Sequence, residues 1–111
     1  MSDERSALRF TRRYTASIDE VWAALTEPES TARWLGSPTD GVARTVEPGR
    51  VLELDWARPG EAESLVRFEL SAEGSGTLLI LEHTRLDADV CMRYMTFWEP
   101  RLRRLGDGLD S

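Results

Sequence analysis

Leu65-Val-Arg-Phe-Glu-Leu70, Glu73-Gly-Ser-Gly76 and Thr77-Leu-Leu-Ile-Leu-Glu-His83 are the consecutive segments that decide the fold. Apolar and polar residues alternate in the first and third segments, which is typical of strands with one buried face. The glycines between them favour a tight hairpin turn. Leu52, Leu54 and Trp56 alternate in the same way before a turn over residues 58–61. The sequence therefore predicts an antiparallel meander of three strands.

Upstream of the meander, the sequence predicts one more strand and two short helices. Residues 8–14 alternate like the strands above. Ser17 is a typical helix N-cap, and Glu20 completes a capping box. Pro28 ends this helix, and a second helix is predicted over 29–34. Residues 37–49 are rich in Gly, Pro, Thr and Asp and are predicted to be mainly loop, with at most one short strand near 42–46.

Downstream, the sequence predicts a long amphipathic helix over 87–105, kinked at Pro100. Apolar residues recur there at helical spacing: Cys91, Tyr94 or Met95, Trp98, Leu102 and Leu105. The sheet and this helix each have one apolar face, and packing the two together buries both. We therefore expect an α+β fold that forms one domain over residues 1–111.

The composition excludes several chemistries. The chain has 111 residues and a formal net charge of −6, and all 14 basic residues are Arg. Without Lys there is no Schiff-base, pyridoxal or Walker-type lysine. A single His and a single Cys exclude a three-histidine zinc site, a C-x-x-C motif and an intrachain disulfide. No metal, no cofactor and no catalytic residue is predicted.

The charge balance also bears on partners and compartment. An acidic chain lacks the basic surface that non-specific nucleic-acid binding requires. Residues 1–5 lack the basic and apolar regions of a signal peptide, and the longest aliphatic run, 78–81, is too short to span a bilayer. We therefore expect a cytoplasmic protein that binds neither nucleic acid nor a membrane.

Three ordered segments resemble the AHSA1-like family (activator of Hsp90 ATPase homologue 1-like), part of the START/Bet v 1-like helix-grip superfamily. The first segment is Arg12-x-Tyr14-x-Ala16, followed by Val21-Trp22-x-Ala24-Leu25-Thr26-x-Pro28-Glu29 and then Trp34. The second is Gly74-Ser-Gly-Thr77-x-Leu79-x-Leu81-x-His83, and the third is Trp98 with Leu102 and Leu105 behind it. The resemblance implies a curved antiparallel sheet wrapped around the C-terminal helix. Only residues 35–50 stand where the family usually carries another pair of strands, so a shortened sheet is expected.

The resemblance also implies a pocket between the sheet and the C-terminal helix. Parity on the strands directs Leu52, Leu54, Trp56, Val66, Phe68, Leu70, Leu79, Leu81 and His83 toward the helix. Aromatic rings and flexible Met side chains suit an apolar ligand of variable shape, although the same residues can simply fill a core. The predicted ligand-binding residues are Arg12, Tyr14, Trp34, Trp56, Phe68, His83, Met95 and Trp98.

Two of these residues carry alternative interpretations. His83 either anchors a ligand or transfers protons, or it is a hydrogen-bonded structural histidine. Arg12 shares a face with Phe10 and Tyr14. Its guanidinium is either buried, where it needs a carboxylate, a set of carbonyl partners or a ligand anion, or it reaches solvent at the sheet edge. The carboxylates Glu53, Glu69 and Glu82 fall on the opposite face of the sheet and are expected to be solvated.

Three functions follow from these expectations. The leading hypothesis is a non-enzymatic domain that binds an apolar or amphipathic small molecule. The resemblance alone implies the second, a module that binds a chaperone and takes part in stress response. The third is a cyclase- or hydrolase-like enzyme that uses His83. Leu65, Leu78 and Ile80 lie on the outer face of the sheet, which motivates a further prediction, a homodimer.

Overall fold

The computed structural model describes residues 6–35, 41–58 and 60–110. Three predictions fall partly outside these ranges. They are the absence of a signal peptide (residues 1–5), the loop over 37–49 (residues 36–40) and the turn over 58–61 (residue 59). The elements in chain order are β1 (Ser6–Tyr14), α1 (Ile18–Thr26), α2 (Pro28–Trp34), β2 (Gly41–Glu47), β3 (Val51–Trp56), β4 (Ser64–Glu73), β5 (Gly76–Leu86) and α3 (Ala88–Asp110).

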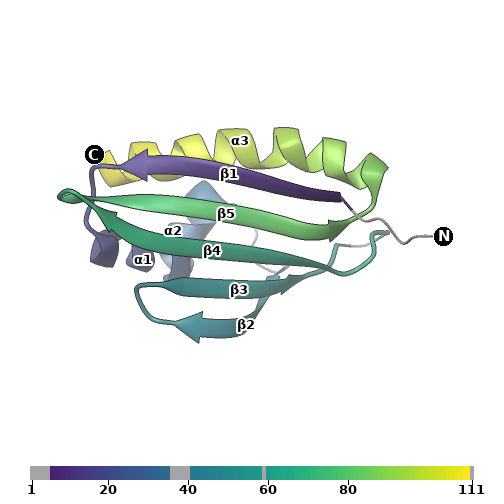
Figure 1. Ribbon diagram of the computed structural model, residues 1–111, viewed down its shortest axis with the longest axis horizontal. Coiled ribbons are helices and arrows are strands. Elements are labelled where there is room, and N and C mark those ends of the chain that lie inside the picture. Colours follow the sequence, from purple (N-terminus) through teal and green to yellow (C-terminus); the bar gives the residue numbers. More distant parts are fainter. Residues whose placement is uncertain (1–5, 36–40, 59, 111) are drawn as a thin grey trace.

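The five described strands form one antiparallel sheet in the order β1-β5-β4-β3-β2. The meander of β3, β4 and β5 is confirmed, and β1 pairs with β5 at one edge. All three described helices lie on one face of the sheet, with α3 running alongside β1 (Figure 1). The predicted α+β class and helix-grip architecture are therefore confirmed. No helix in the described ranges is long and apolar enough to cross a bilayer.

The two faces of the meander are as the alternation predicted. Inward-facing side chains on β4 and β5 are buried, and Val66, Leu79 and Leu81 have no exposed surface. On β3, Leu52 and Trp56 are buried, whereas Leu54 is half-buried. On the outer face, the Arg67 guanidinium lies 3.4 Å from Glu53 and 3.3 Å from Glu69. Such half-exposed pairs contribute little to stability, so burial of the inner face dominates the energetics of this sheet.

The start of α1 follows the predicted capping box. The Glu20 amide donates to Ser17 Oγ at 3.3 Å, and the Ser17 amide donates to Glu20 Oε1 at 3.1 Å. Glu27 then adopts an extended backbone, because the ring of Pro28 disfavours a helical residue before it. Pro28 itself is the first residue of α2, where a missing amide hydrogen costs nothing.

The prediction that residues 37–49 are mainly loop is wrong for Gly41–Glu47, which form β2. This strand pairs with β3, and its register shifts between Ala43 and Thr45. Backbone pairing with a distant strand therefore overrides the local composition, while the shift breaks the alternation by which a strand is recognised. The short strand expected near 42–46 is the one that forms.

The side of α3 that faces the sheet carries Tyr94, Trp98, Leu102 and Leu105, which are all buried. Met92 and Met95 are 71% and 52% exposed. Of the two alternatives Tyr94 and Met95, Tyr94 takes the inward position, so the prediction that Met95 faces the sheet is wrong. The helix continues through Pro100 to Asp110, five residues beyond the predicted end at Leu105.

Candidate functional site

A cavity of about 380 Å³ lies between the helix pair α1–α2 and the strands β2–β3. It touches three of the predicted ligand-binding residues, Trp34, Trp56 and Phe68. The remaining walls are mostly apolar: Leu25, Thr26, Pro28, Thr31, Leu35, Gly41, Ala43, Val46, Leu52 and Leu54. Its volume falls at the lower end of the range of about 300–1,000 Å³ for small-molecule sites.

Polar groups in the cavity wall already have partners within the protein. The indole N–H of Trp34 donates to the Ala24 carbonyl at 2.8 Å. The indole N–H of Trp56 donates to Tyr94 Oη at 2.9 Å, and Thr31 Oγ1 donates to a carbonyl of its own helix at 3.0 Å. An occupant therefore meets carbon surface and ring faces, which suits an apolar molecule.

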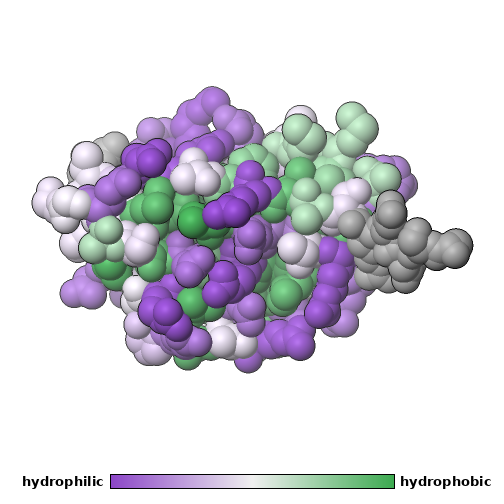
Figure 2. All heavy atoms as spheres, viewed as in Figure 1, coloured by the Kyte–Doolittle hydropathy of each residue, from purple (hydrophilic) through white to green (hydrophobic). Residues whose placement is uncertain are grey.

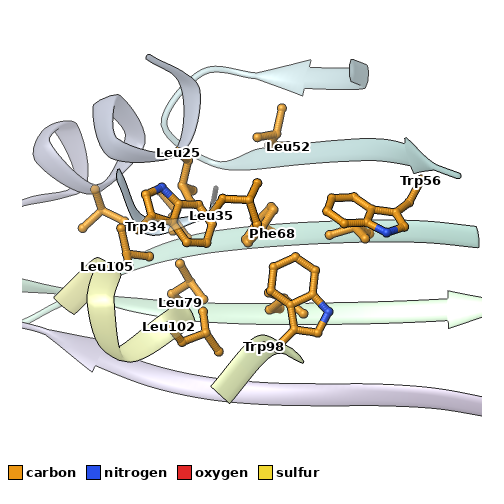
Figure 3. Packing of buried hydrophobic residues seen from close by; sticks show 14 of the residues in the cluster. Leu25, Trp34, Leu35, Leu52, Trp56, Phe68, Leu79, Trp98, Leu102 and Leu105 are labelled. Carbon is orange, nitrogen blue, oxygen red and sulfur yellow. The ribbon is translucent and has the colours of Figure 1, made fainter. Parts of the chain in front are cut away.

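Packed aromatic rings fill the interface between the sheet and α3, where the sequence placed the ligand. The ring of Trp98 lies 5.5 Å from that of Trp56 and 6.1 Å from that of Phe68, centroid to centroid. The close-up in Figure 3 shows Trp98 reaching from α3 toward these two side chains. The cavity consequently lies beside this interface, nearer to β2, and Trp98 does not line it.

His83 is fully buried at the centre of a hydrogen-bonded chain. The indole N–H of Trp98 donates to His83 Nδ1 at 3.0 Å, and His83 Nε2 lies 2.8 Å from Ser64 Oγ. Because an indole can only donate, Nδ1 must accept, so the ring proton sits on Nε2 and is donated to Ser64. Ser64 in turn donates to the Trp56 carbonyl at 3.4 Å.

The environment of His83 keeps the imidazole neutral. Burial lowers the pKa of His83 to about 4. Both ring nitrogens are occupied by side chains, and the ring does not line the cavity. The structural interpretation of His83 is therefore favoured over proton transfer or ligand anchoring, both of which need a free nitrogen beside a substrate.

Arg12 and Tyr14, on the edge strand β1, form hydrogen bonds with α3. Arg12 donates to Glu99 on α3 at 3.0 Å, and its side chain is 33% exposed. Tyr14 Oη donates to the Leu102 carbonyl at 3.1 Å, and burial raises the pKa of Tyr14 to about 12. Neither residue lines the apolar cavity, so Arg12 follows the interpretation in which its head reaches the solvent. Met95 is exposed and does not line the cavity either.

A second, polar hollow of about 270 Å³ lies at Tyr94 and Phe97, which both contact Trp56, and no sequence pattern predicted it. It is lined by Arg58, Glu61, Arg93, Tyr94 and Phe97. Tyr94 Oη donates to Glu61 Oε1 at 2.7 Å, and burial together with this bond raises the pKa of Tyr94. Glu61 lies in a turn with no flanking motif, so the sequence held no signal for this pairing. Among the described residues, no group of three or more His, Cys, Asp or Glu side chains could hold a metal.

Comparison with known proteins places this geometry in a family. No family model matches the chain, and neither does any curated protein. Among solved structures, CalU16 from Micromonospora echinospora is 30% identical, with a TM-score of 0.79; the match covers 93% of this chain and 81% of CalU16. The AHSA1-like protein RHE_CH02687 from Rhizobium etli is 28% identical over the same shares, with a TM-score of 0.76.

The chain belongs to the AHSA1-like family. Its fold is accordingly the START/Bet v 1-like helix grip that the sequence resemblance implied. The Aha1 dimer from Colwellia psychrerythraea shares this fold, with a TM-score of 0.83 over 94% of this chain and 96% of that one. At 16% identity the likeness of this AHSA1-like chain to Aha1 concerns the architecture alone.

Proposed function

We propose that this AHSA1-like chain is a non-enzymatic binding domain for an apolar small molecule, held in the cavity between α1–α2 and β2–β3. The observation that carries the proposal is an apolar cavity of about 380 Å³ whose polar wall groups are already hydrogen-bonded. Burial of ligand surface would drive binding, at roughly 25 cal/mol per Å². The helix-grip fold supports the proposal, since its sheet and helices leave a space of this kind.

The experiment uses the tryptophans of the wall. Trp34 and Trp56 both line the cavity, so an occupant is expected to change the intrinsic fluorescence. The uncharged fluorescent probe N-phenyl-1-naphthylamine would be titrated into the purified chain. Saturable probe binding, with a matching change in tryptophan emission, supports the cavity as a ligand site.

A matched pair of variants on β2 locates the binding. Ala43 lines the cavity, whereas the neighbouring Val42 does not and is 66% exposed. Ala43→Phe places a ring in the ligand's space and is expected to weaken probe binding roughly tenfold or more, whereas Val42→Phe is expected to leave it unchanged. Equal affinity in both variants, or no saturable binding to the wild type, would overturn the proposal.

The other two functions stay predictions. A chaperone partner follows from the family resemblance, and recovery of a chaperone in a pull-down would support it. An enzyme acting through His83 would need a free ring nitrogen, and the two nitrogens bond to Trp98 and Ser64. We therefore favour ligand binding, for which the structure supplies a cavity.

A further inference from the structure

A groove of about 520 Å³ lies among α1, α2 and the last turns of α3, and it is distinct from the apolar cavity. The C-terminal end of α3 and α1 lie at the same end of the molecule (Figure 1). The volume of this groove falls within the range of about 300–1,000 Å³ for small-molecule sites. None of the functions considered above makes use of it.

Part of the groove wall is apolar. This part consists of Ala23, Ala24, Trp34, Leu105 and Leu109. Trp34 and Leu105 are buried, and the other three are half-buried. The indole N–H of Trp34 donates to the Ala24 carbonyl at 2.8 Å, so the indole offers only carbon surface to an occupant. The wall can therefore hold the apolar body of a small molecule.

Three charged side chains line the same groove, two cations and one anion. Arg33 on α2 and Arg104 on α3 are exposed, and neither takes part in an ion pair with a described residue. The anion, Glu20, accepts hydrogen bonds from the Ser17 amide and hydroxyl, each at 3.1 Å.

The charged groups of the wall thus sum to one positive charge, in a chain whose formal net charge is −6. Nearby carboxylates do not cancel this charge from within the groove. Asp19, Glu27, Glu29 and Asp107 all lie outside its wall. The groove therefore complements an anion with a single negative charge.

We propose that this groove binds a small organic anion, with an apolar body and one carboxylate or sulfonate group. The body packs against Trp34 and Leu105, and the anionic group meets Arg33 and Arg104. The planar fork of a guanidinium matches such a group in charge and geometry. The site is separate from the proposed function, because its two arginines do not line the apolar cavity.

Two probes with the same ring system test the preference for an anion. The anionic probe is 8-anilinonaphthalene-1-sulfonate, which is N-phenyl-1-naphthylamine with one added sulfonate group. We expect the anionic probe to bind the wild type saturably. The double variant Arg33→Gln/Arg104→Gln is expected to weaken this binding roughly five- to tenfold, because two charge contacts are lost, and to leave binding of the uncharged probe unchanged.

A matched control removes the same charge elsewhere. Arg9 and Arg103 are also exposed, and neither lines the groove. The double variant Arg9→Gln/Arg103→Gln is therefore expected to bind the anionic probe like the wild type. Equal affinities of the two double variants, or no saturable binding of the anionic probe to the wild type, would overturn the inference.

A second pair of variants separates the groove from the apolar cavity. Gly108 lines the groove, and a Cβ there would meet nothing within 4 Å, so Gly108→Phe places a ring in open space. Gly108→Phe is expected to weaken binding of the anionic probe, whereas Ala43→Phe in the cavity leaves it unchanged. The reverse result would place the anionic probe in the cavity and overturn the groove site. The proposed function fails separately, when N-phenyl-1-naphthylamine does not bind.

Discussion

Ser64, His83 and Trp98 form the polar centre of an otherwise apolar core. Their hydrogen bonds satisfy both nitrogens of the one histidine in the chain, and no buried side-chain polar atom of the described residues lacks a partner. Such a network adds little net stability when it is complete, but it is costly when one member is missing. The three residues therefore depend on one another.

Loss of the Ser64 hydroxyl tests this dependence. Ser64→Ala leaves the Nε2–H of His83 buried without an acceptor, and we expect the free energy of unfolding to fall by about 1–3 kcal/mol. Ser71→Ala is the matched control, because Ser71 lies on the same strand but is exposed. Urea denaturation of both variants measures the difference. Equal stabilities would show that the Ser64 bond contributes nothing to the core.

The buried imidazole also predicts a dependence of stability on pH. The folded pKa of about 4 lies below the ordinary 6.5, so the unfolded chain takes up the proton first as the pH falls. The contribution of His83 is complete above pH 6.5 and is lost progressively toward pH 4, by roughly 3 kcal/mol in total. His83→Gln is expected to flatten the curve of unfolding free energy against pH between 6.5 and 4.5. Parallel curves for the variant and the wild type would contradict this assignment.

At the scale of the element, two glycines on α3 make different contacts with the edge strand. A Cβ at Gly106 would lie 3.0 Å from Tyr14 Cε1, whereas a Cβ at Gly108 would meet nothing within 4 Å. The absence of a side chain at Gly106 thus allows the Tyr14 ring to lie against the helix and donate to the Leu102 carbonyl.

Alanine at these two positions is expected to have opposite effects. Gly108→Ala raises the free energy of unfolding by up to about 1 kcal/mol, because alanine favours the helix. Gly106→Ala gains the same helix propensity, but its Cβ crowds the Tyr14 ring and displaces it from its packed position. We therefore expect a net fall in the free energy of unfolding. Thermal unfolding of the two variants side by side measures the contrast, and stabilisation by both substitutions would show that the Tyr14 contact is loose.

The elements that the sequence predicted well are those with an unbroken period. Alternation on β3, β4 and β5 assigned each residue to a face, because a strand offers only two faces. A helix is less decisive: neighbouring residues differ by about 100° around its axis, so Tyr94 and Met95 fit the same stripe. Packing against His83, with ring centroids 4.4 Å apart, selects Tyr94. No period could have shown this.

At the scale of the whole molecule, the cavity was only partly predicted because its position depends on how elements distant in the chain pack together. Trp34, Trp56 and Phe68, three of the predicted ligand-binding residues, line the observed cavity. The position of that space depends on how α1–α2 sit over β2–β3, elements distant in the chain, and on the volume that Trp98 fills. Arg12 and His83 drew attention as polar residues on an apolar face, but their partners, Glu99 and Ser64, lie on other elements.

The outer face of the sheet bears on the predicted homodimer. Leu65, Leu78 and Ile80 are half-buried there, and Figure 2 shows apolar patches on this face interrupted by hydrophilic side chains. We expect light scattering at micromolar concentration to give twice the chain mass of 12.6 kDa. Ile80→Arg, which places a charge among these side chains, is expected to yield the monomer. A wild type that is monomeric throughout the range would refute the dimer.

The proton on His83 Nε2 can serve as a spectroscopic probe of whether the core around His83 is intact. The chain has one histidine, and that ring is sealed from water between Ser64 and Trp98. Its N–H should thus exchange slowly with deuterium and give a single downfield imidazole resonance in a nuclear magnetic resonance spectrum. Loosening of the core at this point, by ligand, heat or acid, would be visible as the fading of one peak.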